Sequence, residues 1–194
     1  MAERLAGGNS ALALLANALA TGFLLPVIIL LFVPFSGAHF NPIVSAAEML
    51  SGRLGKLRTA LYSIAQTIGA VLGVWLAHLM FGEVVLQTSG HVRTGISQWL
   101  SEIVATAGLI LMILFRKKLP AGHLPWMIGA YIAAAYFFTA STSFANPAVT
   151  LARSLTNTFA GIRPYDVPAF MLSQFIGMLA AWLLVKWFDR METP

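Results

Sequence analysis

Two short motifs of the same kind occur in this 194-residue sequence, Asn41-Pro42-Ile43 and Asn146-Pro147-Ala148. Asn is a good helix N-cap because its side chain accepts hydrogen bonds from the first N–H groups of the helix, and Pro suits the first turn. The amide of each Asn also carries N–H donors, which a hydroxyl or water oxygen could accept. The motifs therefore predict two helix starts, each with an amide that can hold a small polar molecule.

The segments around these motifs are too apolar for a soluble domain. The sequence is 58% hydrophobic and 10% charged, with a mean hydropathy of +0.79, whereas soluble domains carry about 25% charged residues. A helix that crosses a bilayer needs roughly 17–25 residues that are mostly apolar. Five runs satisfy this and are predicted to be full membrane spans, at residues 10–34, 58–82, 98–115, 124–141 and 167–188.

The two motif segments, 41–50 and 146–156, are too short to cross a bilayer and are predicted to be re-entrant half-helices. Eight of the twelve Lys and Arg residues fall in loops on one side of the predicted spans. Because basic residues concentrate on the cytoplasmic side, the C-terminus is predicted to be cytoplasmic. Five spans then place the N-terminus of this chain outside, in the periplasm.

Several classes of function are excluded by residue type. The basic residues are scattered between apolar runs, so the sequence offers no continuous face for nucleic acid. It has no Cys, and its four His are dispersed, so no disulfide, thiol chemistry, metal site or cofactor is expected. There is no nucleophile–base pair, and an enzyme is therefore not expected.

The chain contains an internal repeat, seen when Asn41 is aligned with Asn146 at an offset of 105 residues. The other aligned pairs are residues 36–40 with 141–145, Glu48 with Arg153 and, at an offset of 108, Gln66 with Gln174. Each copy would hold an odd number of spans, so the copies must run in opposite directions. Such inverted repeats place their half-helices face to face at the membrane midplane.

The first copy, residues 1–90, lacks one span that the second copy, residues 91–194, possesses. The span at 98–115 has no partner, because the same offset leads to about residues −7 to 10. Two explanations remain open. Met1 could be an internal methionine of a longer protein, which the unpaired span favours, or the protein could be a five-span variant.

These features resemble the aquaporin and aquaglyceroporin (major intrinsic protein) family. The resemblance is carried by Ser36-Gly37-Ala38-His39-Phe40-Asn41-Pro42 and Phe144-Ala145-Asn146-Pro147-Ala148, supported by Gln66-x-x-Gly69-Ala70-x-x-Gly73. It implies an all-α membrane protein with an aquaporin-like inverted repeat, a single channel domain over residues 1–194, and a homotetramer in the lipid bilayer. The implied pore midplane consists of Asn41, Pro42, Ile43, Asn146, Pro147 and Ala148.

The resemblance also implies a selectivity filter, whose four positions follow from their spacing to the motifs. They are Thr21, Ala134, Ser143 and Val149. Most family members have arginine at the position of Val149. Arg153, one turn later, is not expected to substitute for it, because Arg153 aligns with Glu48. Small side chains at all four positions predict a wide filter without a fixed charge.

Three further residues have roles implied by the family. Glu102 corresponds to a buried acid that accepts hydrogen bonds from the re-entrant loops, although an interfacial acid is the alternative. His39 corresponds to a histidine whose backbone carbonyl lines the pore, and a packing histidine is the alternative. Ile43 replaces the usual alanine, and it either spreads the half-helices or is accommodated with little change in conduction.

A wide, uncharged filter resembles the bacterial aquaglyceroporins associated with arsenic resistance. The resemblance implies passive flux of small neutral solutes, and of arsenite and other metalloid acids as neutral polyols, across the bacterial inner membrane. A facilitator of glycerol, urea or water is an alternative. A truncated remnant that conducts nothing is another.

Overall fold

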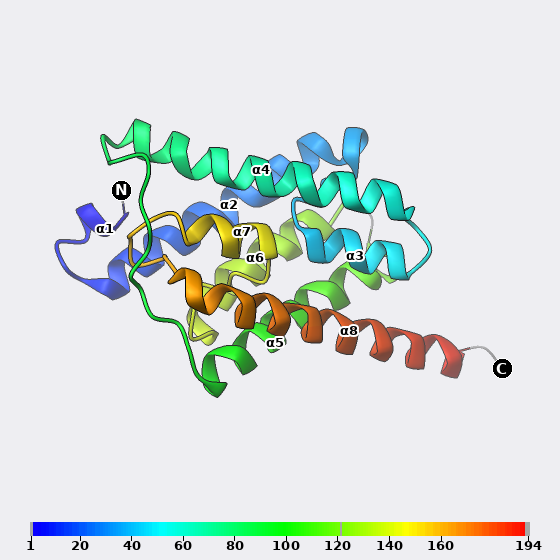
Figure 1. Ribbon diagram of the computed structural model, residues 1–194. Coiled ribbons are helices and arrows are strands. Elements are labelled where there is room, and N and C mark those ends of the chain that lie inside the picture. Colours follow the sequence, from blue (N-terminus) through cyan, green and yellow to red (C-terminus); the bar gives the residue numbers. More distant parts are fainter. Residues whose placement is uncertain (1, 121, 193–194) are drawn as a thin grey trace.

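The computed structural model describes residues 2–120 and 122–192, and the regular elements of this part of the chain are all helices (Figure 1). The α-helices are α1 (Ala2–Leu5), α2 (Ser10–Ser36), α3 (Pro42–Leu50), α4 (Lys56–Met80), α5 (Ile96–Leu114), α6 (Leu124–Phe138), α7 (Pro147–Arg153) and α8 (Val167–Glu192). Two short 3-10 turns, η1 (Arg116–Lys118) and η2 (Pro164–Asp166), precede α6 and α8.

The five predicted spans are present as α2, α4, α5, α6 and α8. Four of them, all except α6, are long and apolar enough to cross a membrane by length and composition. Helix α6 has 15 residues, a length of about 22 Å, and it ends three residues before the predicted boundary. The reason is that Thr139 adopts an extended backbone, which begins the loop that leads back into the molecule.

Both motifs start a half-helix, as their cap chemistry predicts. Pro42 is the first residue of α3, and the Asn41 side-chain oxygen accepts the N–H of Ile43 at 2.9 Å. Pro147 is the first residue of α7, which Asn146 caps in the same way. Helix α7 is shorter than the predicted 146–156, because a tight turn follows Arg153.

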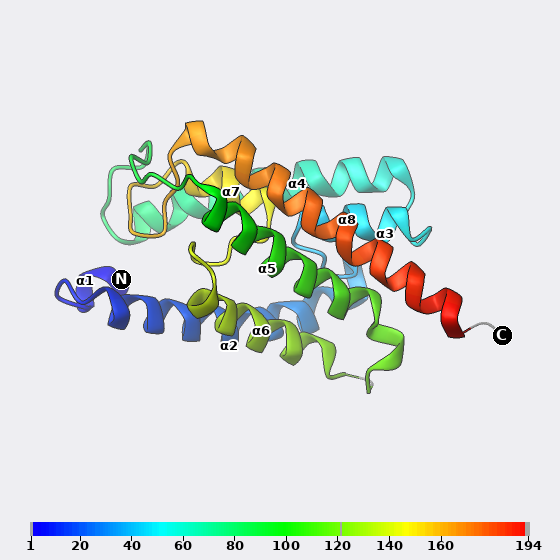
Figure 2. The same ribbon diagram turned by 90° about the horizontal axis from the view of Figure 1, so that it is seen from below.

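The half-helices lie between two long helices, and they run from the centre of the molecule toward opposite ends (Figure 1). Both α3 and α7 contact α4 on one side and α8 on the other, and they also contact each other. Helix α2 packs on α6, and α5 packs on α8, and Figure 2 shows each pair side by side. Together these elements surround the two loops that carry the Asn-Pro motifs.

One glycine explains the close packing of α5 on α8. A Cβ atom on Gly177 would collide with the carbonyl oxygen of Ile103, so only glycine fits there. Gly69 of α4 is its counterpart in the first copy, at the 108-residue offset. A Cβ atom on Gly69 would meet nothing within 4 Å. The flank of α4 that carries Gly69 is therefore open in the described part of the chain.

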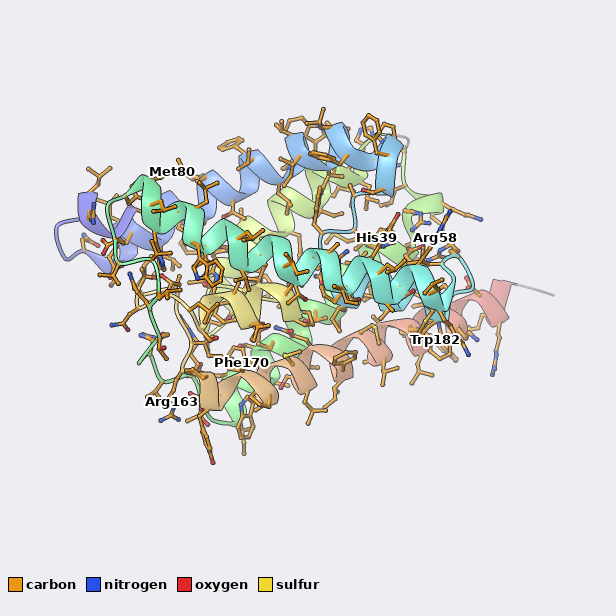
Figure 3. The ribbon with its side chains drawn as sticks, turned by 45° about the horizontal axis from the view of Figure 1, so that its top comes forward. His39, Arg58, Met80, Arg163, Phe170 and Trp182 are labelled. Atoms are coloured by element: carbon orange, nitrogen blue, oxygen red, sulfur yellow. The ribbon has the colours of Figure 1, made fainter. Side chains whose placement is uncertain are left out.

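The alternating direction of the long helices separates the loops into two ends. Arg58 and Trp182 lie at one end, which we call the basic end, and Met80 and Arg163 lie at the other, which we call the opposite end (Figure 3). The basic end carries the eight residues on which the predicted orientation rests: Arg53, Lys56, Arg58, Arg116, Lys117, Lys118, Lys186 and Arg190.

Candidate functional site

A cavity of about 690 Å³ lies between α2, α3, α5, α6 and α7. At the basic end its lining includes Glu48 and Arg116, and at the opposite end it includes Arg153. Asn41 and Asn146 line it between these ends. The cavity therefore follows the long direction of the helices and passes both motif amides.

The two amides are fixed by a reciprocal exchange between the halves of the chain. Asn41 Nδ2 donates to the carbonyl oxygen of Ala145 at 2.7 Å, and Asn146 Nδ2 donates to the carbonyl oxygen of Phe40 at 2.9 Å. Phe40 and Ala145 are themselves partners at the 105-residue offset. Because each NH₂ group has two N–H donors, each amide keeps a second donor for a solute in the cavity.

The loops before the motifs share an unusual backbone conformation. Ala38 and Phe40 have φ values of 50° and 47°, and their repeat partners Ser143 and Ala145 have 50° and 44°. Residues other than glycine rarely adopt this left-handed backbone conformation, and such backbone strain is concentrated at functional sites. All four residues line the cavity, so the strained loops form its wall where the halves meet.

The other four implied midplane residues follow the two Asn residues in the half-helices, and none of them lines the cavity. Pro42 and Pro147 begin the half-helices. Ile43 is 0% exposed and Ala148 is 2% exposed. The extra carbons of Ile43 pack into the main hydrophobic core, so the change from the family's usual alanine adds no bulk to the cavity.

Glu102 connects the second loop to the surrounding helices. It is fully buried, and its Oε1 accepts the Ser141 hydroxyl at 2.6 Å and the Phe144 N–H at 3.2 Å. Its Oε2 accepts the Ala145 N–H at 3.0 Å and Gln174 Nε2 at 2.9 Å. One carboxylate thus satisfies four donors and holds the strained loop in place.

A hydroxyl four residues after each Asn is a feature that the sequence interpretation missed. Thr150 Oγ1 donates to the Asn146 carbonyl oxygen at 2.8 Å and accepts from Gln174 Nε2 at 2.8 Å. Ser45 Oγ has the equivalent place in the first half, and it accepts from Gln66 Nε2 at 3.2 Å. The signal was available, because residues 45 and 150 are separated by the repeat offset of 105.

His39 lies in the first loop and lines the cavity (Figure 3). Its Nδ1 is 3.0 Å from Ser45 Oγ, and its ring makes an edge contact with Tyr62 at 5.5 Å between centroids. The side chain is therefore held by both a polar and an aromatic neighbour on the wall of the cavity.

Three of the four implied filter residues, Thr21, Ser143 and Val149, line the cavity. Ser143 is buried, and its hydroxyl has no hydrogen-bond partner in the described part of the chain. It can therefore bond to a solute. Val149 supplies an apolar surface beside it.

Ala134 does not lie at the cavity, which corrects the fourth filter position. It is exposed on α6, whereas Ile128, Ile132 and Tyr136 of the same helix line the cavity. Residues four apart share a helix face, and residue 134 lies about 200° around the helix from residue 132. Tyr136 lines the cavity instead, and its hydroxyl is 3.1 Å from Thr21 Oγ1.

Arg153 lines the cavity as well, which corrects the expectation of a filter without fixed charge. Its Nη1 donates to Thr142 Oγ1 at 2.5 Å and to the Ala160 carbonyl oxygen at 3.1 Å. Its Nη2 donates to the Tyr136 hydroxyl at 3.4 Å, and the guanidinium lies 5.0 Å from the centre of the Phe144 ring. These contacts fix a positive charge at the opposite end of the cavity.

The repeat alignment of Arg153 with Glu48 is correct but does not keep Arg153 from the cavity, because both residues line it. Residues seven positions after each Asn lie on the same face of a half-helix as the residue three positions after it. Because the two half-helices run in opposite directions, Glu48 lies at one end of the cavity and Arg153 at the other. Spacing within the half-helix was the signal that could have identified Arg153.

The two ends differ in charge. Glu48 accepts Arg53 Nε at 2.7 Å and also pairs with Arg116, so its charge is compensated. Arg153 pairs with no carboxylate in the described part of the chain, and Arg93 stacks on the same Phe144 ring at 5.3 Å. Burial, together with the nearby charge of Arg153, lowers the pKa of Arg93 to about 10. Arg93 therefore stays protonated at neutral pH.

Comparison with known proteins places this geometry in a family. The model of the major intrinsic protein family matches residues 3–143. The aquaglyceroporin AqpS of Rhizobium meliloti (strain 1021) is 53% identical over 186 residues, which cover 96% of this chain and 80% of that protein. The aquaporin TIP1-2 of Musa acuminata is 35% identical over 111 residues, which cover 55% of this chain and 43% of that protein.

Another relative is the neurogenic protein big brain of Drosophila melanogaster, 36% identical over 84 residues, which cover 43% of this chain and 12% of that protein. The all-helical fold, the paired motifs and the family match agree, and they identify a membrane channel and not an enzyme. This chain belongs to the major intrinsic protein family, as an aquaglyceroporin-type channel for small solutes.

Proposed function

We propose that the channel conducts neutral metalloid acids, arsenite above all, together with polyols such as glycerol. The observation that carries this proposal is the lining of the cavity at the opposite end. Val149 leaves space where an arginine would otherwise project, and the hydroxyl of Ser143 is free to bond there. A solute with several hydroxyl groups can use that hydroxyl, Tyr136 and Arg153 on one side while its other side contacts apolar residues.

The cavity has a volume of about 690 Å³, and its lining combines polar groups with apolar side chains. The two amides between the ends offer donors to hydroxyl oxygens, and they do not require a charge on the solute. A water, glycerol or urea facilitator without metalloid flux is the alternative.

The proposal is tested by measuring arsenite, glycerol and water fluxes in proteoliposomes that contain the chain, against empty liposomes. We expect arsenite and glycerol influx at least about tenfold above the empty liposomes, which corresponds to a barrier lower by about 1.4 kcal/mol. Water flux alone would contradict the proposal and favour the alternative. Absence of all three fluxes would contradict the channel function in this chain.

We propose in addition that Arg153 excludes cations. A unit charge about 5 Å away at an effective dielectric constant of ~20 repels a cation by about 3 kcal/mol. Arg153→Leu should therefore raise Na⁺ and proton leak through proteoliposomes at least tenfold. Neutral-solute flux should stay within about twofold, because Leu keeps the apolar part of the side chain.

Two variants separate charge from structure in this experiment. Arg153→Lys retains the positive charge and should keep the cation leak low. Arg163→Leu removes a positive charge from the same end, but Arg163 does not line the cavity and pairs with Asp166 at 2.8 Å. If Arg163→Leu raised the leak as much as Arg153→Leu, the barrier would be a general surface effect and the assignment would fail.

We also propose a homotetramer in the bacterial inner membrane, with the basic end in the cytoplasm. The eight basic residues at that end support the orientation through the positive-inside rule. Accessibility of single cysteines introduced at Lys56, the first residue of α4, and at Glu83, in the loop after α4, would test the orientation in intact cells. Chemical cross-linking of the membrane-embedded protein would test the subunit number.

A further inference from the structure

A second cavity, of about 290 Å³, lies at the basic end and shares no lining residue with the channel cavity. It is formed by the loop after α3, by the end of α5 with η1, and by α8. Trp182, Val185, Lys186 and Asp189 line it from α8, and their spacing of three and four residues puts them on one helix face. The channel function does not use this cavity.

The charge of this cavity is strongly positive. Among the described residues that line it, four are basic (Arg53, Lys117, Lys118 and Lys186), and Asp189 is acidic. Arg53 shares Glu48 with Arg116, and including that pair leaves the same excess of three positive charges. A concave site with an excess of basic over acidic lining residues at a membrane surface attracts a phosphate-bearing anion.

Aromatic and apolar side chains form part of the lining of this cavity. The Lys186 ammonium lies 4.2 Å from the centre of the Trp182 ring, which holds the lysine in place. Leu114 and Val185, which also line the cavity, are buried. Trp182 lies at the same end of the molecule as Arg58 (Figure 3), and tryptophan at such an end is typical of the membrane interface.

An apolar stripe on α8 begins near the start of the helix and ends at Leu183, one turn before Lys186, which lines this cavity. The residues of the stripe are Leu172, Ile176, Leu179 and Leu183, all of them exposed. They follow one another at intervals of four, three and four residues, and they cover about 16 Å of the helix. A free phosphate ion would use only the charges. A phospholipid would use the charges with its headgroup and the stripe with an acyl chain.

We propose that this cavity binds the phosphate headgroup of an anionic phospholipid, with an acyl chain along the α8 stripe. Lys117 and Lys186 contact the phosphate, and Trp182 lies at the level of the glycerol backbone. The basic end of the channel is thereby attached to the anionic face of the membrane.

The test is native mass spectrometry of the purified full chain in detergent, titrated with phosphatidylglycerol, phosphatidylcholine or inorganic phosphate. The chain should bind phosphatidylglycerol at least tenfold more tightly than the zwitterionic lipid. The double variant Lys117→Gln/Lys186→Gln should weaken phosphatidylglycerol binding about thirtyfold, since each basic residue near an anionic headgroup contributes roughly a factor of five.

The matched control is Lys56→Gln/Arg58→Gln, which removes two charges from the same end but outside the cavity. It should change the affinity less than twofold. Lys117→Arg/Lys186→Arg keeps both charges and should retain binding, which separates a lost site from misfolding. Equal affinity for the two lipids, or an equal loss in the control, would overturn the proposal. Inorganic phosphate bound as tightly as phosphatidylglycerol would overturn the lipid as the source of the phosphate.

Discussion

Glu102→Leu is expected to lower the free energy of unfolding by about 3–5 kcal/mol and to abolish solute flux. Leucine has a similar volume, so the loss comes from hydrogen bonds and not from a cavity. Four donors would lose their acceptor in a fully buried place: the Ser141 hydroxyl, the N–H groups of Phe144 and Ala145, and Gln174 Nε2. Unfolding in detergent micelles, followed by circular dichroism, measures the first effect, and proteoliposome flux measures the second.

The matched control for this substitution is Glu83→Leu. Glu83 is an exposed acid that pairs with Arg4 at the surface, and surface pairs contribute only about 0–1 kcal/mol. The loss of unfolding free energy in Glu102→Gln should lie between those of the two variants. The amide keeps one acceptor oxygen, but its NH₂ group places a donor where the carboxylate had its second acceptor oxygen. A change of less than about 1 kcal/mol in Glu102→Leu would show that the carboxylate does not hold the second loop.

Val149→Arg is expected to reduce arsenite and glycerol flux at least tenfold, and water flux much less. Val149 lines the cavity, and Arg153 lies four residues later on the same helix face. Their Cβ atoms are therefore roughly 5–6 Å apart, and a second guanidinium would fill the space between the existing one and the α2 wall. Parallel measurements of the three fluxes in proteoliposomes check the selectivity of the effect.

Val149→Met is the control for bulk, because it adds an unbranched side chain without charge or donors. It should lower the glycerol flux less than Val149→Arg does. Unchanged arsenite and glycerol flux in Val149→Arg would mean that residue 149 does not face the narrow part of the channel. Equal losses in both variants would mean that width alone, and not charge, decides passage at this position.

Several features of the protein follow from the sequence by itself, because they depend on groups that are near one another along the chain. Hydropathy over about 20 residues identifies the long helices. The starts of α3 and α7 follow from Asn and Pro at adjacent positions, since a cap acts on N–H groups only two or three residues away. The offset of 105 residues predicts that the two loops are equivalent, and their φ values agree with this pairwise.

The tertiary structure alone decided which side chains line the cavity. Counting back from Asn146 leads to Ala134, but Ala134 is exposed on α6, whereas Tyr136 of the same helix lines the cavity. The alignment of Arg153 with Glu48 suggested that Arg153 lies outside the filter. Arg153 nevertheless lines the cavity, because it lies on the same face of α7 as Val149. The partner of Glu102 on α8, Gln174, lies 72 residues further along the chain. Rotations of helices and contacts between distant segments come from packing, which local propensity and spacing do not encode.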